Sequence, residues 1–278
     1  MKKILIAFNA ADINLNIMDF ACYIAKLSRS KLTGVFIEQL LGEEAPALKK
    51  AYGSAYVETI VAEDIPENKI RKNEWDRNIH FFEEACQTRG VNYSVHQDRG
   101  VPVEEIIMES RFADLLIVDP AMSLGEKTEG IPSHFVKEVL AKSECPVIIA
   151  PFGFDGIDEI LFTYDGSASS VFSIKQFNYL FSELANTKVT VFQVKNNDEP
   201  VTEKDKIGEL MQNYYSSIGY RTAQGTPENA LFDYLLGKKK VFVVMGAYSR
   251  TMLSNFFKRS TADLIVKTID LPFFIAHP

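Results

Sequence analysis

Cysteine and histidine are scarce in this chain, and neither forms a cluster. Its 278 residues include 3 cysteines and 4 histidines. The cysteines are odd in number, far apart and without a Cys-x-x-Cys pair: Cys22, Cys86 and Cys145. This usage predicts reduced core residues of a cytoplasmic protein rather than a disulfide framework. The histidines have no second ligand at metal-binding spacing, so no metal site is expected. They are His80, His96, His134 and His277.

The chain also lacks an excess of positive charge and any long apolar run. Its formal net charge is −7, of which −6 falls on residues 1–152. This balance argues against a general affinity for nucleic acid or for anionic membranes. No apolar stretch approaches the roughly 20 residues that span a membrane. Five apolar residues follow the two lysines at the start, but Asn9 and Asp12 interrupt the run. We therefore predict a first strand there and not a signal peptide.

What the sequence does contain is a weak internal repeat. Three segments of the first half return in the same order in the second: ILIAF (4–8) as ILFTY (160–164), GVPVE (100–104) as GTPE (225–228), and CPVIIAP (145–151) as LPFFIAHP (271–278). A prior of about 150 residues per domain also gives two domains for this length. We therefore predict two related domains, at 1–152 and 157–278, with a glycine-containing linker between them.

Short β-branched runs alternate with helical patterns in both halves. The expected strands are 3–8, 31–37, 91–96, 114–118 and 147–150, then 159–164, 188–194, 220–223, 241–245 and 273–276. The expected helices are 14–29, 66–89, 102–111 and 133–142, then 169–185, 203–217, 228–236 and 255–269. In the long helix, Trp75, Ile79 and Phe82 share one face, so Trp75 is expected in the core. The alternation predicts an α/β fold, with a five-stranded parallel sheet and flanking helices in each half.

The repeat is interrupted in the first half. The first strands are 156 residues apart, but the later motifs are only 125 to 127 apart. About 30 extra residues therefore precede Gly100, and the segment 40–63 is the candidate insertion. A lid and an interface are both open for it, although a solvent-covered loop with a short helix is the favoured interpretation.

The repeated motifs resemble those of the universal stress protein family, over nearly the whole chain as a tandem pair. The family's first strand ends in Asp-Gly-Ser, its third leads into Gly-x-Pro, and its last opens with Cys-Pro-Val. The matching segments are 165–167, then 100–102 and 225–227, and 145–147, with 271–273 as a looser match. The resemblance implies two Rossmann-like domains of the adenine nucleotide alpha hydrolase-like type. They would form an intramolecular pseudo-dimer in which the last strands, 147–150 and 273–276, meet.

The second half retains part of the family's nucleotide motif, which is Gly, two residues, Gly, nine residues, Gly, then Ser or Thr. Gly246 matches the first glycine and Ser260 the final hydroxyl, but Ser249 and Arg259 replace the other glycines. Side chains there obstruct the approach of backbone N–H groups to phosphate. Arg250 keeps the loop basic. By the resemblance, the candidate nucleotide-binding residues are Asp165, Gly166, Ser167, Val194, Gly246, Arg250 and Ser260.

Two interpretations of these residues stay open. In the relatives that bind ATP, the Asp after the first strand and the end of the second strand flank the adenosine, which implicates Asp165 and Val194. Alternatively, Asp165-Gly166-Ser167 is an ordinary turn with a serine cap on the next helix.

The first half has lost the motif. Asn9-Ala10-Ala11 stands where Asp-Gly-Ser would be, and Asp119-Pro120 follows the fourth strand. Glu126 and Glu129 come shortly after. Carboxylates repel a triphosphate and Pro120 removes a backbone donor, so this half is not expected to bind one.

No catalytic group can be assigned. The chain has no GxxxxGK[ST] sequence, and no base can be matched to its serines. We therefore predict a non-catalytic, cytoplasmic stress-response protein without a cofactor, which acts by ligand sensing or by binding a protein partner. A further homodimer is left open. The alternatives are a switch that binds ATP or AMP in the second half only and, less favoured, a hydrolase of phosphate esters or anhydrides.

Overall fold

The computed structural model describes residues 2–9, 14–38, 44–51, 54–61, 66–99, 101–123, 130–196, 199–246, 269–276 and 278. The elements of the first half are β1 (Lys3–Asn9), α1 (Leu15–Leu27), β2 (Lys31–Glu38), β3 (Glu44–Ala51), β4 (Ser54–Val61), α2 (Pro66–Thr88), β5 (Tyr93–Arg99), α3 (Pro102–Ser110), β6 (Leu115–Val118), α4 (His134–Lys142) and β7 (Val147–Ile149). Those of the second half are β8 (Glu159–Thr163), α5 (Ala168–Leu180), the short 3-10 helix η2 (Ser182–Leu184), β9 (Lys188–Val194), α6 (Lys204–Gln212), β10 (Ile218–Ala223), α7 (Pro227–Leu235), β11 (Val241–Gly246) and β12 (Phe273–Ala276).

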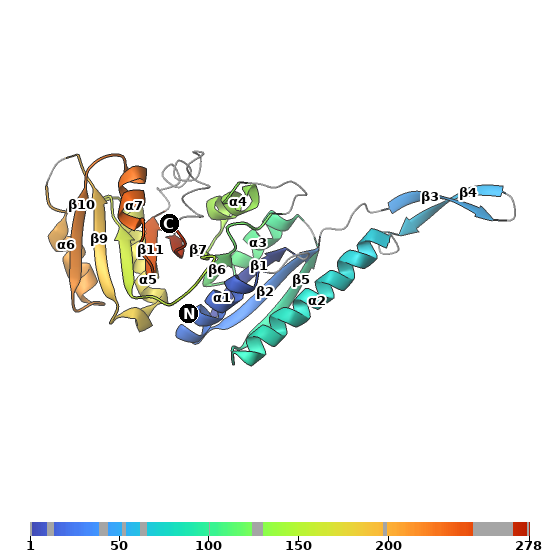
Figure 1. Ribbon diagram of the computed structural model, residues 1–278, viewed down its shortest axis with the longest axis horizontal. Coiled ribbons are helices and arrows are strands. Elements are labelled where there is room, and N and C mark those ends of the chain that lie inside the picture. Colours follow the sequence, from blue (N-terminus) through green and yellow to red (C-terminus); the bar gives the residue numbers. More distant parts are fainter. Residues whose placement is uncertain are drawn as a thin grey trace.

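One ten-stranded sheet runs through both halves (Figure 1). Its order is β10-β9-β8-β11-β12-β7-β6-β1-β2-β5, so each half contributes five strands in the same relative order. The pairs within each half are parallel, and β12 pairs with β7 antiparallel, with Phe274 opposite Ile148. The predicted α/β pseudo-dimer, joined through its last strands, is therefore confirmed. Each last strand covers the edge that the other would expose.

Helices cover both faces of this sheet. On one face α1, α2, α5 and α6 pack their apolar side chains against alternate strand residues of both halves. On the other face α3, α4 and α7 do the same. The central strands β6, β7, β8, β11 and β12 are buried throughout, and their near-continuous apolar sequences suit a place between two helical layers, whereas the edge strand β10 is partly exposed. Trp75 is only 6% exposed and the three cysteines are buried and free, which confirms their predicted place in the core.

Local sequence signals start several helices. Side chains of Asn14, Ser133 and Ser167 cap the amino ends of α1, α4 and α5 by accepting backbone N–H bonds. Pro102 and Pro227, from the repeated Gly-x-Pro motif, start α3 and α7, where a proline lacks only an N–H that needs no helical partner. The repeat is thus a repeat of helix starts as well as of strands.

The expected short helix in the insertion is wrong for the residues that the structure describes there. β3 and β4 form a separate two-stranded antiparallel sheet, with Leu48 opposite Val57. The run 54–61 is rich in β-branched and aromatic residues, which favour strands over helices. Figure 1 shows this hairpin projecting beyond α2, at the opposite end of the molecule from the second half. It does not cover the candidate site of that half.

Two expected helices of the second half are shorter than predicted. The helix expected at 169–185 ends at Leu180 and η2 follows, while the one expected at 203–217 ends at Gln212. In both places an aromatic side chain turns into the core: Phe181 packs on Phe177, with ring centroids 4.9 Å apart, and Tyr215 is buried. Tertiary burial therefore overrides the helical pattern. The helix expected at 255–269 lies outside the described residues, apart from its last position.

Candidate functional site

The carboxyl ends of β8 and β11 meet in the second half, as expected for the first and fourth strands of such a sheet. Gly246 ends β11 and lies directly against the first turn of α5. A Cβ placed on Gly246 would be 2.8 Å from backbone atoms of both Ser169 and Ser170. The structure thus brings Gly246 close to the turn formed by Asp165, Gly166 and Ser167.

This turn builds a helix start. Asp165 Oδ1 accepts a hydrogen bond from the Ser167 N–H at 2.9 Å, and Gly166 has a φ of +84°, which favours glycine. Ser167 Oγ accepts from the Ser170 N–H at 3.1 Å and so caps α5. The geometry has the features of the turn with a serine cap, although an exposed carboxylate at this edge remains available to a ligand.

The Asp165 carboxylate is stabilised in its charged form. Desolvation acts to raise the pKa of Asp165, but hydrogen bonds from Ser167 and Ser170 outweigh it and lower the pKa below the ordinary value. The group is therefore an anion at neutral pH. An anion at this place suits a hydrogen-bond donor such as a ribose hydroxyl or an amine, and it repels phosphate.

Gly246 has a structural use that the motif alone did not reveal. The space that a side chain would occupy is filled by the backbone of α5, not left open for phosphate oxygens. Close approach between a helix and a strand end requires glycine for the same steric reason as close approach to a ligand. The presence of Gly246 therefore gives no separate support to phosphate binding.

Val194 ends β9, the neighbour of β8, and is half-buried against the apolar layer beneath α7. The adjacent residue Gln193 was missed in the sequence. Its side chain accepts from the Thr202 N–H at 2.7 Å and donates to Thr202 Oγ1 at 3.1 Å. Thr202 in turn lies beside Gly166, 3.6 Å from where a Cβ would be. The one signal for this pair was a polar residue near the end of an apolar strand.

Arg250 and Ser260, the other two candidates, lie outside the described residues, as do Ser249 and Arg259. Their roles stay predictions that rest on the sequence.

At the corresponding edge of the first half, the described polar side chains bond to one another and to the backbone. The Asn14 amide donates to Asp119 Oδ2 at 3.0 Å, and Asp119 Oδ1 accepts from the Ala121 N–H at 2.8 Å. Ser133 caps α4 and donates to the Met122 carbonyl. The carboxylate that follows the fourth strand is thus engaged within the protein. Glu126 and Glu129 lie outside the described residues.

Within the described part of the chain, no group of three or more His, Cys, Asp or Glu side chains could hold a metal ion. No helix there combines the length and the apolar character needed to cross a membrane.

Comparisons with known proteins agree with this architecture. No family model matches the chain, and no curated protein matches it either. Solved structures do. A universal stress protein from Archaeoglobus fulgidus DSM 4304 is 16% identical and has a TM-score of 0.67, with 99% of this chain and 96% of that chain covered. A protein from Pseudomonas aeruginosa UCBPP-PA14, described as a universal stress protein, is 13% identical with a TM-score of 0.57, and 100% and 93% are covered.

The chain therefore has the fold of the tandem universal stress proteins, as its motifs predicted. The same fold also serves another class of protein. The cytoplasmic domain of a prokaryotic cation chloride cotransporter is 6% identical with a TM-score of 0.54, over 99% of this chain and 94% of that one. The function consequently has to be argued from the site and not from the fold.

Proposed function

We propose that this chain is a tandem universal stress protein that acts in the cytoplasm without catalytic turnover, by ligand sensing or by binding a protein partner. One observation carries the proposal. At the carboxyl edge of both halves, polar groups in the positions where a ligand would be bound are engaged in turns and helix caps. Such groups build structure, and among the described residues of these edges they include no paired acid and base for a reaction.

The projecting hairpin of β3 and β4 supports partner binding. A two-stranded hairpin on its own is marginally stable, and its outer strand edges present unpaired backbone groups. A second copy of this chain or another protein that pairs with these edges would stabilise the hairpin.

The division of the chain into two domains, 1–152 and 157–278, is also part of this proposal.

The test of the proposal combines activity and assembly. Purified protein with ATP and Mg²⁺ should release no phosphate above the blank, and the same holds for an aryl phosphate ester. The parent should hold a partner or self-associate in light scattering, and a variant in which residues 44–61 are replaced by a short Gly-Ser linker should fold and lose that association. Phosphate release by the parent that is abolished in Asp165→Ala would contradict the absence of catalysis. Unchanged association in the hairpin variant would contradict the role of the hairpin.

An ATP or AMP switch in the second half is the alternative, and the exposed, charged Asp165 favours it. Nucleotide that binds the native state must raise its thermal midpoint. A rise with ATP or AMP that disappears in Asp165→Ala would establish the switch and replace the proposal of a nucleotide-free protein. Asp165→Asn is the matched control, because its side chain can still accept the Ser167 N–H while the charge is gone.

A further inference from the structure

A pocket of about 230 Å³ lies on the α5–α6 side of the second half, away from the candidate nucleotide site. It is formed where α5 ends, where η2 leads into β9, and where α6 ends. This is the opposite edge of the sheet from Asp165 and Gly246. Its lining is Asn178, Phe181, Ser182, Ala185, Asn213, Tyr214 and Tyr215, none of which is charged.

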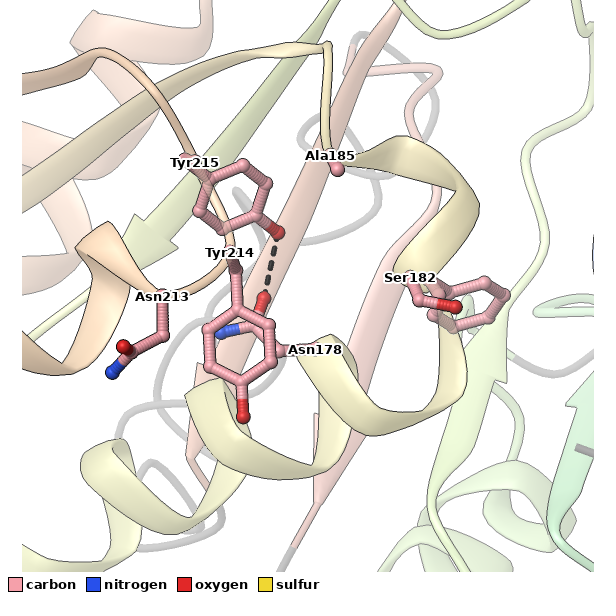
Figure 2. A pocket seen from close by; sticks show the side chains of 7 residues that line it. Asn178, Ser182, Ala185, Asn213, Tyr214 and Tyr215 are labelled. Carbon is pink, nitrogen blue, oxygen red and sulfur yellow. Dashed lines mark hydrogen bonds between the residues drawn. The ribbon is translucent and has the colours of Figure 1, made fainter.

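One polar atom of this lining has no partner among the described residues. Asn178 is 2% exposed, and its Oδ1 accepts a hydrogen bond from the Tyr215 hydroxyl at 2.6 Å. Its Nδ2 is buried and makes no hydrogen bond. Figure 2 shows this nitrogen on the far side of the amide from the Tyr215 hydroxyl, toward Tyr214 and Asn213. A buried donor without an acceptor is unfavourable, so a native site of this kind needs an explanation.

The walls of the pocket are aromatic. Phe181 and Tyr215 are 1% and 3% exposed, and Tyr214 is half-buried. Burial raises the pKa of Tyr215, so its hydroxyl stays protonated and continues to donate to Asn178. Tyr215 is therefore a fixed support for the amide, whereas Tyr214 is only half-buried and lies between the rings of Tyr179 and Tyr215, with centroids 6.4 and 6.5 Å away.

We propose that this pocket binds an uncharged, planar ring compound that carries a carbonyl or ring-nitrogen acceptor. A cavity of roughly 150 Å³ holds one benzene ring, so the volume here suits one or two rings. The lining gives a charged ligand no counter-ion, and aromatic walls favour a flat one. Asn178 Nδ2 donates to the acceptor of the ligand. Because that nitrogen is buried, the ligand reaches it when the half-buried Tyr214 ring shifts.

The proposal is independent of the nucleotide question, since it concerns the other edge of the sheet. The test uses the full chain and saturation-transfer NMR with three probes: benzamide, ethylbenzene and benzoate. Benzamide has the acceptor and no charge, ethylbenzene lacks the acceptor, and benzoate is charged. We expect benzamide to bind most tightly. Asn178→Leu should weaken the affinity for benzamide about tenfold, as expected for the loss of one hydrogen bond, and should leave the affinity for ethylbenzene unchanged or higher.

Two further variants keep the test decisive if Asn178→Leu fails to fold. Ala185→Leu places a larger side chain on the pocket wall and should abolish benzamide binding. Ser217→Leu makes a similar change at an exposed position outside the pocket and should leave binding intact. Benzamide that binds Ala185→Leu as well as it binds the parent would overturn the proposal. So would an absence of binding by all three probes, which would mean that water alone partners the amide.

Discussion

Replacing Gly246 with alanine separates the two reasons for a glycine at the end of β11. If the glycine is there for helix packing, the added methyl group collides with α5. Its carbon would lie 2.8 Å from backbone atoms of Ser169 and Ser170, closer than real Cβ atoms approach. Backbone atoms cannot rotate away, so the first turn of α5 must shift.

The size of the effect follows from two opposed terms. Overpacking of this kind costs about 1–3 kcal/mol. Alanine also restricts the unfolded chain, which stabilises the folded protein by about 0.4–1 kcal/mol where the backbone conformation allows it. Gly246 has no positive φ, so that gain applies. We expect a net loss of about 1–2 kcal/mol in the free energy of unfolding, or about 2–8 °C in thermal midpoint.

The measurement is urea unfolding followed by circular dichroism, with thermal melts in parallel. Gly219→Ala on the edge strand β10 is the control, since its added carbon would lie 3.3 Å from the Val189 carbonyl, and it should change stability by less than about 1 kcal/mol. A Gly246→Ala protein that is as stable as the parent but has lost affinity for ATP would refute the packing argument. The glycine would then serve the ligand.

Four further outcomes are expected. Ser167→Ala should lower the free energy of unfolding by about 1 kcal/mol through loss of the α5 cap, whereas Ser216→Ala, at an exposed position, should not; equal effects would contradict the capping role. Burial raises the pKa of Cys145 to about 12, and the other two cysteines are also buried. Ellman's reagent at pH 8 should therefore react slowly with the native protein and reach three thiols only on unfolding, and rapid reaction of the folded chain would disprove this. Desolvation acts to raise the pKa of Glu159, but hydrogen bonds from Thr190 and Lys188 and the nearby Lys238 lower it below its ordinary value. The charged Glu159 therefore stabilises the folded state above the unfolded pKa, and this contribution is lost as pH falls through the lower, folded pKa. The parent should accordingly lose more stability than Glu159→Gln on acidification below about pH 4.5, and equal losses would contradict the lowered pKa. Fragments 1–152 and 157–278, expressed together, should copurify because β7 and β12 each need the other's edge; two separate monomers on size exclusion would argue against these boundaries.

Much of the fold could be read from the order of residues, for identifiable reasons. Buried parallel strands such as 241–246 are apolar throughout, and the starts of α3 and α7 carry a proline at the one position where it is harmless. What failed was decided by contacts distant in sequence. Phe181 and Tyr215 end their helices early because each finds a place in the core.

The candidate site divides in the same way. Its residue types could be named from the sequence, because a helix cap and a phosphate loop both use serine and glycine at strand ends. The sequence could not show what fills the space beside Gly246, or that Gln193 and Thr202 hold the neighbouring segment. Such facts depend on which helix lies across which strand end.

The sequence alone therefore determined the repeat and the α/β class, since these follow from periodicity and from motifs that recur, while the meeting of the two last strands was implied by the resemblance to universal stress proteins. Tertiary structure alone decided where the insertion projects, that Ser167 of the Asp165 turn caps α5, and that the Asn178 Nδ2 atom, which makes no hydrogen bond, lies beside an aromatic pocket. The physical reason is that close packing and hydrogen-bond satisfaction are properties of neighbours in space. Those neighbours are fixed only once the helices have packed onto the sheet.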